Sequence, residues 1–315
     1  MTNNVDNRKF IPLSIALIGA MHVIALNAEA QQEPQFSQSA QLLNSQFPSF
    51  NGWHGGLQVS GLTRQQFTGF EGRPETTHIN TDAYVAKAHT GIGLHYFHDG
   101  LGQMAFQRLQ LSISPRIVIN KRFAFLPSIG YARNRFRLGR NNWRNLWTSS
   151  TPPFIFDANQ LNIGLGFVVD RWYGAFNYKS GSVFSPQNQW TAGWGWNTTF
   201  SMNPAYSFMG GTSFSKLNWV FQPGLIVQTD LSSIQYKINL NARYKGLYIG
   251  LSTEFVNYYI VGIGYEFVNR YRLSYTYDLT TSRIRRGSNG SHEIGIRILL
   301  FDRPEHRLMA APGIF

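Results

Sequence analysis

Polar and apolar residues alternate one by one along residues 235–244, and this pattern restricts the possible folds more than any other feature of the chain. The apolar positions are Tyr236, Ile238, Leu240, Ala242 and Tyr244. The polar positions between them are Gln235, Lys237, Asn239, Asn241 and Arg243. An α-helix would scatter both sets around its circumference, whereas a β-strand directs successive side chains to opposite faces. The segment therefore predicts a β-strand with one apolar face.

The alternation recurs along the chain, for example in residues 109–119, 162–167, 271–277 and 293–300. A soluble β-sandwich also alternates, but segments of about ten residues with aromatic residues near their ends favour a lipid-facing barrel. The predicted fold class is all-β, a transmembrane outer-membrane β-barrel of about 14 antiparallel strands. The strands are expected to start near Trp53, Thr76, Thr90, Ala105, Phe123, Gln160, Trp172, Ala205, Leu217, Ile234, Leu247, Tyr259, Tyr271 and His292.

The connections between these strands fall into two length classes. Asp170-Arg171 and Lys245-Gly246 are two-residue turns, and residues 120–122 and 268–270 form similarly short links. Long connections span residues 134–158, 180–204 and 279–291. Each short link closes an even strand to an odd one, and each long connection follows an odd strand. Outer-membrane barrels have short turns at the periplasmic rim and long loops outside, so the two classes predict opposite rims.

The N-terminus resembles an export signal. Arg8 and Lys9 precede an apolar stretch over residues 10–26, and Ala28-Glu29-Ala30 supplies small residues for cleavage. A membrane anchor is the alternative, but His22 and the short apolar run argue against it. The chain has no cysteine, so neither a lipoprotein anchor nor disulfides are expected.

The predicted organisation has four parts: a signal peptide at 1–30, a periplasmic N-terminal segment at 31–52, a β-barrel at 53–301 and a periplasmic tail at 302–315. Phe315 could be a barrel-assembly signal, but a last strand ending near Phe301 favours a simple tail. The formal charge is +12, and Arg8, Lys9, Asp6 and Glu29 cancel in the leader. For an exported chain this excess favours outer-membrane lipid or acidic proteins as partners and excludes nucleic acid.

Strand parity predicts charged side chains on the lumen side of five consecutive strands. These are Arg243, Glu254, Glu266, Arg272, Glu293 and Arg297. A charge in a narrow lumen is costly unless it is paired or hydrated. Opposite signs favour a cross-barrel network that occludes the lumen, and an open, water-filled porin is the alternative.

Two groups of basic residues are expected at the rims. The short turns and the tail predict a periplasmic docking surface comprising Lys121, Arg122, Arg171, Lys245, Arg270, Arg303 and Arg307. At the outer side, the longest loop is expected to open with Arg133, Arg135, Arg137, Arg140 and Arg144. These arginines would bind lipid-A phosphates or an acidic partner. Trp190, Trp194 and Trp196 would form a partner-binding patch or pack within the next loop.

Catalytic and metal-binding readings find little support. His95, His98 and Asp99 lie near Ser112 and Ser114, but no serine has an elbow motif, and a hydrolase needs its nucleophile and base in contact. His95 is expected in the lumen, with His98 and Asp99 in a loop. The glycines of 91–93 and 164–166 do not open a helix, so they are interpreted as strand glycines. No catalytic residue, cofactor or metal is predicted.

Ordered motifs resemble a known family. They are QQEPQFSQ (31–38), RQQFTGFEGRPETTHINTDA (64–83), GIGLHYFHDGLG (91–102), LNIGLGFVVDRWYGAFNYKS (161–180), LSYTYDL (273–279) and GSHEIGIRI (290–298). Together they resemble the PorP/SprF family of outer-membrane proteins, although SQFPSFNG (45–52) stands where that family usually carries an Asn-Pro-Ala-type motif.

The resemblance implies a role in type IX secretion and gliding motility, without a catalytic site. It implies partners among periplasmic ring or peptidoglycan-linked components, or a secreted protein or adhesin that the barrel helps to export or hold. A porin-like or hydrophobic-solute transport barrel is the alternative function.

Overall fold

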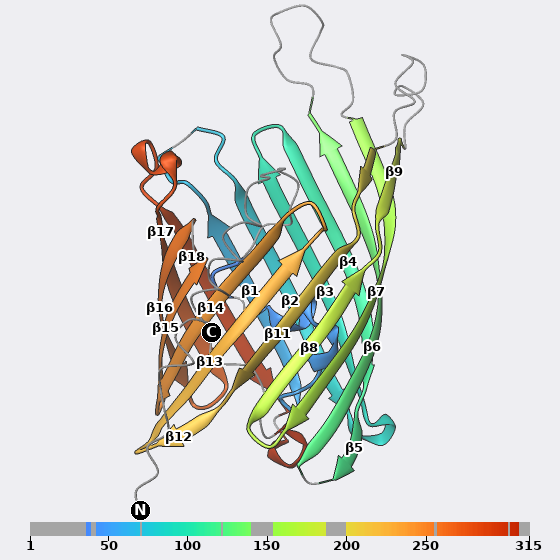
Figure 1. The fold of residues 1–315 in the computed structure, drawn as a ribbon, viewed down its shortest axis with the longest axis vertical. Helices are drawn as coiled ribbons and strands as arrows, with labels where there is room; N and C mark the ends of the chain where they lie inside the picture. Colours follow the sequence, from blue (N-terminus) through green and yellow to red (C-terminus); the bar gives the residue numbers. More distant parts are fainter. Residues whose placement is uncertain are drawn as a thin grey trace, which may run out of the picture.

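The computed structural model describes residues 36–38, 42–69, 71–120, 122–139, 154–186, 200–254, 257–301 and 303–308. Within them, strands form one closed antiparallel barrel (Figure 1). Four of the 18 strand segments, β5, β9, β10 and β12, prolong a longer neighbour. The wall therefore has 14 strands, which confirms the predicted fold class and strand number. The predicted signal peptide at 1–30 and Phe315 lie outside the described residues.

The strands have the following bounds. They are β1 (Leu57–Gln65), β2 (Glu75–Val85), β3 (Thr90–Leu101), β4 (Met104–Pro115), β5 (Ile117–Asn120), β6 (Phe123–Leu138), β7 (Phe154–Val169), β8 (Trp172–Lys179), β9 (Ser182–Pro186), β10 (Phe200–Met202), β11 (Ala205–Thr212), β12 (Phe214–Lys216), β13 (Trp219–Thr229), β14 (Ile234–Tyr244), β15 (Leu247–Glu254), β16 (Tyr258–Phe267), β17 (Tyr271–Thr280) and β18 (Ser291–Leu300). Short helices are α2 (Leu43–Gln46), η2 (Pro48–Phe50), η3 (Ala86–Ala88), η4 (Arg283–Arg286) and η5 (Pro304–His306). None of the helices in the described ranges is long and apolar enough to cross a membrane.

The barrel closes where its first strand meets its last. β1 pairs with β18 over its whole length, from Leu57 opposite Leu300 to Gln65 opposite His292. Every other strand pairs antiparallel with its neighbours in the chain. Closure gives each wall strand of the described ranges a partner on both sides, as hydrocarbon surroundings require.

The predicted two-residue turns are present at one rim. Tyr244 pairs with Leu247 and Val169 pairs with Trp172. Lys245 and Asp170 adopt φ angles of 52° and 50°, which matches the positive φ favoured in tight hairpins. The opposite rim carries the long connections, but it also has a short turn at Gly102 between β3 and β4. The two rims therefore differ in their longest connections, whereas short turns occur at both.

Two expected boundaries differ from the structure. β1 begins at Leu57 rather than near Trp53, and β7 begins at Phe154 rather than near Gln160. β6 continues to Leu138 and β7 begins at Phe154, so both ends of the predicted loop 134–158 are strand. Inward and outward side chains continue to alternate there, but the outward residues change from apolar side chains to Arg133 and Arg135. The sequence analysis interpreted this change as the start of a loop.

The wall is apolar outside and polar inside. Large apolar side chains such as Leu111, Ile263 and Leu273 are more than half exposed on the outer face. Asn80, Gln110 and many other polar residues are buried on the inner face. This arrangement is the reverse of a soluble barrel and is typical of strands that face lipid.

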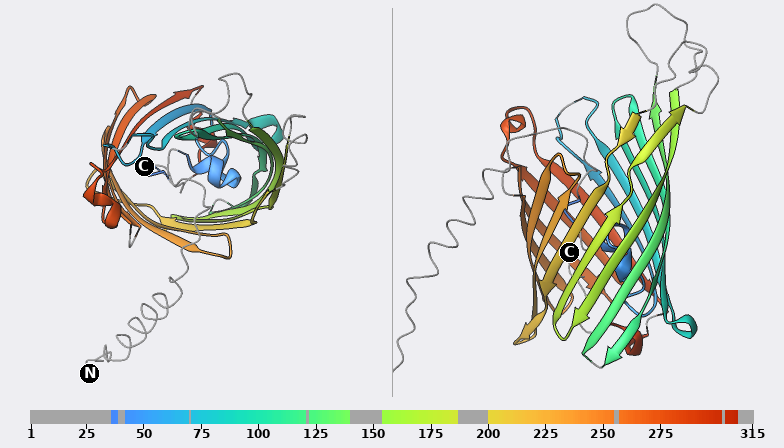
Figure 2. Two further views of the ribbon diagram at one scale, coloured as in Figure 1. Left: turned by 90° about the horizontal axis from the view of Figure 1, so that it is seen from above. Right: turned by 45° about the vertical axis from the view of Figure 1, so that its right-hand side comes forward.

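The N-terminal segment differs from the expectation. Residues 31–52 were expected to be periplasmic, but the described residues 36–38 and 42–52 lie inside the barrel, as the view along the barrel in Figure 2 shows. Phe47 and Phe50 are fully buried there. We call residues 36–38 and 42–54 the plug. Apolar residues in this segment have no membrane to face, so they are buried against the inner wall instead.

The described part of the tail, residues 303–308, lies against the end of the plug nearer the short-turn rim, which we call its lower end. The amide of Leu308 donates to the carbonyl oxygen of Trp53 at 3.1 Å. The guanidinium of Arg116 donates to the carbonyl oxygens of both His306 and Gly52. The plug and the described tail residues therefore meet at the short-turn mouth.

Candidate functional site: the plugged lumen and the basic rim

The plug is anchored by an apolar cluster on one side of the lumen. Leu43, Phe47 and Phe50 pack against inward-facing residues of β6, β7, β8 and β11. The wall side of the cluster comprises Ala124, Leu126, Val168, Tyr173, Ala175 and Met209. Burying a Leu or Phe side chain contributes about 1.5–3 kcal/mol, so this side of the plug is a small hydrophobic core.

Glycines of the wall make room for the plug. An added Cβ at Gly91 would lie 1.9 Å from the carbonyl oxygen of Asn51, so no other residue fits at Gly91 while the plug is seated. Gly52 of the plug has φ +67°, and an added Cβ there would lie 2.7 Å from the carbonyl oxygen of Ala83. Gly91, one of the strand glycines that the sequence analysis identified, is therefore a site of close backbone approach.

Hydrogen bonds from the wall satisfy the backbone of the plug. Gln110 donates to the carbonyl oxygen of Ser45 at 3.3 Å, and Ser114 donates to that of Ser49 at 2.8 Å. At the lower end, the amide of Gly52 donates to Asp82 at 2.8 Å. Irregular backbone is tolerated at membrane depth only where such partners exist.

Residues 36–38 form the upper end of the plug, nearer the long-loop rim, and this end binds a buried charge cluster. Arg64 lies 2.8 Å from Asp278 and 2.5 Å from Glu293, and all three side chains are at most 4% exposed. The two oxygens of Glu293 accept the backbone amides of Ser37 at 2.6 Å and Gln38 at 3.0 Å. One carboxylate thus pairs with Arg64 and also holds two consecutive residues of the plug.

Lys237 holds the same end of the plug from the facing wall. Its ammonium donates to the carbonyl oxygens of Phe36 at 2.8 Å and Ser37 at 2.9 Å. Glu254 lies within electrostatic range of Lys237 and Arg64. We call these five residues the upper cluster: Arg64, Lys237, Glu254, Asp278 and Glu293.

A second group of charges, the lower cluster, lies nearer the short-turn rim. Glu266 is 3.3 Å from Arg272 and forms a short contact with Arg297. The guanidinium of Arg272 stacks 3.6 Å from the ring centroid of Tyr248, whose hydroxyl donates to Glu266 at 3.1 Å. The guanidinium of Arg243 lies 6.0 Å from the centroid of the same ring.

The structure divides the six predicted lumen residues between these clusters. Arg243, Glu266, Arg272 and Arg297 belong to the lower cluster, and Glu254 and Glu293 belong to the upper cluster. The register explains the division, because Arg272 pairs with Arg297 whereas Thr276 pairs with Glu293. Four residues of strand separate the two levels by about 13 Å. Strand parity predicts whether a side chain faces the lumen, but not its position along the barrel axis.

The sequence analysis missed Arg64, Lys237, Asp278 and the plug itself as members of this site. Arg64 and Asp278 occur in the motifs 64–83 and 273–279, and both lie on inward positions of their strands. β1 pairs with β18 so that Arg64 lies opposite Glu293. Because both residues face inward, the sequence could have predicted this ion pair once the two strands were paired.

His54, outside the strands, is buried where the plug meets the lower cluster. Burial is the first cause that lowers the pKa of His54 well below its usual range, and the nearby Arg297 and Arg272 lower it further. The imidazole is therefore neutral at physiological pH, as a site beside several arginines requires.

The described basic residues predicted at the periplasmic rim are all exposed. They are Arg122, Arg171, Lys245, Arg270, Arg303 and Arg307; Lys121 lies outside the described residues. They form two groups, since Arg122 and Arg171 flank β6 to β8 whereas Lys245 and Arg270 flank β14 to β17. Arg122 is 3.6 Å from Asp170. Lys87, in the turn at η3, adds a further cation that the prediction omitted.

The three described arginines of the predicted outer group lie on the barrel wall rather than in a loop. Arg133 and Arg135, on β6, are 60% and 46% exposed and both contact Asp157 of β7 at 2.8 Å. Arg137 also lies in β6. Arg140, Arg144, Trp190, Trp194 and Trp196 lie outside the described residues.

The histidines and serines that suggested a hydrolase do not assemble into a triad. The hydroxyl oxygen of Ser112 is 3.4 Å from Nε2 of His95, but both residues are buried beside Asn51 of the plug. Asp99 instead accepts a hydrogen bond from Thr76 at 2.6 Å, and His98 approaches Gln107. His98 and Asp99 lie in β3, not in the expected loop. Among the described residues, no three acidic or histidine side chains are grouped to hold a metal ion.

The chain is similar, at low identity, to several solved structures. The CymD monoaromatic hydrocarbon channel has a TM-score of 0.46 and 10% identity, covering 88% of this chain and 94% of that chain. A Pseudomonas aeruginosa FadL homologue has a TM-score of 0.43 and 8% identity, covering 77% and 89%. The KdgM porin has a TM-score of 0.39 and 10% identity, covering 77% and 99%. No curated protein matches the sequence.

A family model decides the membership. The model described as "Type IX secretion system membrane protein PorP/SprF" matches residues 28–298, which include the plug and all but the end of the barrel. The family and the closed barrel together locate the protein in the outer membrane. The chain belongs to the PorP/SprF family of type IX secretion system membrane proteins.

Proposed function

We propose that this protein is a non-enzymatic component of the type IX secretion and gliding motility machinery. In this role it supports the export or surface anchoring of secreted proteins or adhesins. Family membership supports the association with secretion. A role without catalysis is supported by Asp99, which accepts a hydrogen bond from Thr76 instead of completing a triad with His95 and Ser112.

The proposed docking surface is the short-turn rim, facing the periplasm. One observation carries this proposal: two groups of exposed basic side chains lie at the rim where the plug meets the tail. A periplasmic ring or peptidoglycan-linked component with an acidic surface would bind there. Such contacts weaken with salt, because charges are screened over about 8–10 Å.

The alternative function is transport of solutes through the lumen. It requires a continuous path, and the packed plug with its fully buried Phe47 and Phe50 supports docking instead. Transport would need displacement of the plug from both the hydrophobic side and the upper cluster.

Charge reversal at one rim tests the proposal. The variant Lys245→Glu/Arg270→Glu is expected to abolish secretion or motility while the barrel still assembles. Arg285→Glu/Arg286→Glu is the matched control, because it changes the same charge at exposed positions of the opposite rim. Both variants are compared at equal outer-membrane levels.

Normal secretion by the Lys245→Glu/Arg270→Glu variant would contradict docking through this rim. Reversal at Arg122 and Arg171 then tests the other half of the surface. If all the reversed variants secrete normally, the rim is not the docking surface.

A further inference from the structure

A cavity of about 260 Å³ lies at the long-loop rim, beside the upper end of the plug. Phe36 and Ser37 line it from the plug, and residues of β1, β3, β14, β15, β16 and β17 line it from the wall. A water molecule occupies about 30 Å³ of liquid, so the cavity has room for the end of a long side chain. We call it the outer chamber.

We propose that the outer chamber binds an organic cation: the ammonium or guanidinium group of a lysine or arginine side chain of a secreted protein. The carboxylates of Asp99, Glu254 and Asp278 line it, together with one cation among the described lining residues, Arg64. Arg64 is 2.8 Å from Asp278 and also pairs with Glu293. Within the described ranges, neither Asp99 nor Glu254 has a cation at ion-pair distance.

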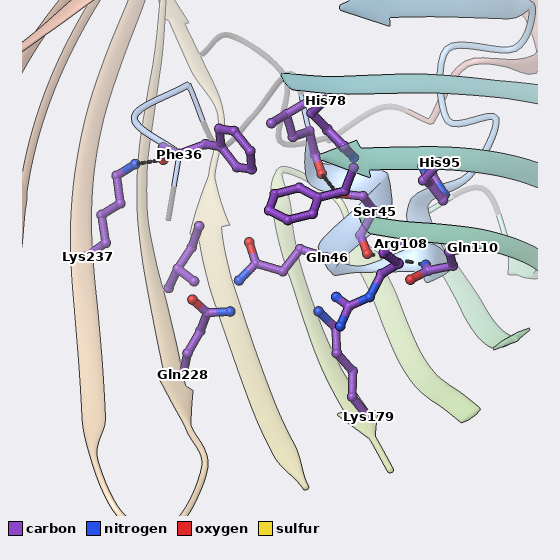
Figure 3. Close-up of a pocket in the computed structure, with 13 residues that line it drawn as sticks. Phe36, Ser45, Gln46, His78, His95, Arg108, Gln110, Lys179, Gln228 and Lys237 are labelled. Atoms are coloured by element: carbon purple, nitrogen blue, oxygen red, sulfur yellow. Dashed lines mark hydrogen bonds between the residues drawn. The ribbon is translucent and has the colours of Figure 1, made fainter. Parts of the chain in front are cut away.

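Glu254 points most directly to a ligand. Its side chain is only 9% exposed, and it accepts no hydrogen bond from the part of the chain that the structure describes. Lys237 acts on it electrostatically, but the ammonium of Lys237 donates to the carbonyl oxygens of Phe36 at 2.8 Å and Ser37 at 2.9 Å. Figure 3 shows the contact with Phe36. A buried carboxylate without a hydrogen bond is costly, and a cationic donor in the chamber would offset this cost.

Asp99 supplies a second acceptor from another strand. Its carboxylate accepts one hydrogen bond, from the hydroxyl of Thr76 at 2.6 Å. An ionised carboxylate has about four lone-pair sites, so Asp99 retains capacity for a further donor. Two negative charges that line one partly shielded cavity repel each other. Such a cavity also attracts positive charge from solution.

The arrangement suits an organic cation better than a metal ion. In the described ranges, no three acidic or histidine side chains are grouped to hold a metal ion. A lysine ammonium has three donors and an arginine guanidinium has five, so either reaches several separated acceptors. Phe36, Leu101 and Tyr258 line the same chamber. Their apolar and aromatic surfaces suit the methylene stem of such a side chain and its charge.

The position of the outer chamber indicates a protein as the source of the cation. Long loops mark the extracellular side of an outer-membrane barrel, and Phe36 and Ser37 of the plug lie between the chamber and the rest of the lumen. A side chain of an exported protein or adhesin would therefore enter from outside. This assignment rests on the proposed function. Charge reversal at the short-turn rim tests that function at the other end of the barrel, so the two proposals can fail separately.

Titration calorimetry on the full-length protein in detergent tests the outer chamber. The probes are blocked glycine peptides whose central residue is lysine, arginine or norleucine, which is uncharged. The lysine or the arginine peptide is expected to bind, and the norleucine peptide is not. Binding of neither cationic peptide, or equal binding of the norleucine peptide, would overturn the proposal.

Three variants locate the binding. Asp99→Asn/Glu254→Gln is expected to weaken it by about tenfold or more, because hydrogen bonds to charged groups are the strong ones. Asp99→Glu/Glu254→Asp keeps both charges and is expected to retain binding within a few-fold. Glu71→Gln/Glu75→Gln removes the same charge from exposed positions of the same rim and is expected to change nothing. Unchanged binding by folded Asp99→Asn/Glu254→Gln would overturn the site.

Two further probes test the source and the place of the cation. n-Butylammonium carries the head group of lysine without a peptide, and it is expected to bind more weakly than the lysine peptide. Equal binding would overturn the protein source in favour of a small amine. A peptide with a photoreactive lysine analogue is expected to cross-link to Leu101 or Tyr258. Adducts confined to the short-turn rim would contradict the outer chamber as the site.

Discussion

The carbonyl oxygen of Asn51 lies so close to Gly91 that a Cβ added at Gly91 would be 1.9 Å away. This contact joins the plug to β3 at the level where Asn51 also donates to Ser112 at 2.9 Å. The smallest possible side chain at Gly91 therefore tests whether the plug is seated as the structure shows.

Gly91→Ala is expected to displace the lower part of the plug, because backbone at 1.9 Å cannot be accommodated by a side-chain rotation. Limited proteolysis and amide exchange of residues 42–52 measure the displacement, and both are expected to increase. Gly61→Ala is the control, since the nearest atom to an added Cβ there is a side-chain carbon at 3.7 Å. Equal protection of the plug in both variants would show that the plug is not held against Gly91.

The lower cluster predicts unequal effects for two of its members. Glu266→Ala removes the carboxylate that contacts both Arg272 and Arg297. Breaking a buried pair by removing one partner costs about 3–5 kcal/mol. Arg243→Ala removes a guanidinium that lies 6.0 Å from the Tyr248 ring, and an exposed cation–π contact contributes about 0.5–1 kcal/mol. The free energy of unfolding in urea measures both, and equal losses would refute this division of roles.

The upper cluster predicts local release of the plug. Glu293→Gln removes the negative charge that accepts the amides of Ser37 and Gln38 and pairs with Arg64. Amide exchange of Ser37 and Gln38 is expected to accelerate while the barrel strands stay protected. Glu305→Gln is the control, because Glu305 is exposed on the tail. Unchanged exchange in Glu293→Gln would mean that the carboxylate does not hold the plug.

The plug is also expected to loosen at acidic pH. The pKa of His54 is lowered by burial and by Arg297 and Arg272, so the unfolded chain binds a proton more readily than the native one. The stabilisation is fully present above the unfolded pKa of about 6.5 and is lost as pH falls below it. Amide exchange around Trp53 is therefore expected to rise between about pH 7 and 5, and His54→Gln should reduce this dependence. A pH-independent exchange rate in the unaltered protein would contradict it.

Much of the wall could be predicted from the sequence because the barrel imposes a strict local rule. Successive residues must face lipid and lumen in turn, and this determined the strand number and the turns at Asp170 and Lys245. The rule became ambiguous where the outward face leaves the apolar layer, as at Arg133 and Arg135, because alternation between two polar sets resembles a loop.

The plug could not be predicted in the same way. Its residues have no periodicity, and its position depends on contacts with residues far along the chain, such as Ser37 with Glu293 and Gly52 with Asp82. Polar character alone suggested a periplasmic segment. Sequence parity gave the inward direction of Glu254 and Glu293 but could not show that the partner of Glu293 comes from β1.

Ion conductance across a planar bilayer tests the central claim, a closed docking barrel, most directly. The unaltered protein is expected to show no stable open state, because the plug fills the lumen with buried apolar and hydrogen-bonded contacts. Gly91→Ala, inserted in the same way, is expected to show openings and serves as the positive control. A steady conductance from the unaltered protein, equal to that of Gly91→Ala, would contradict the account and favour solute transport.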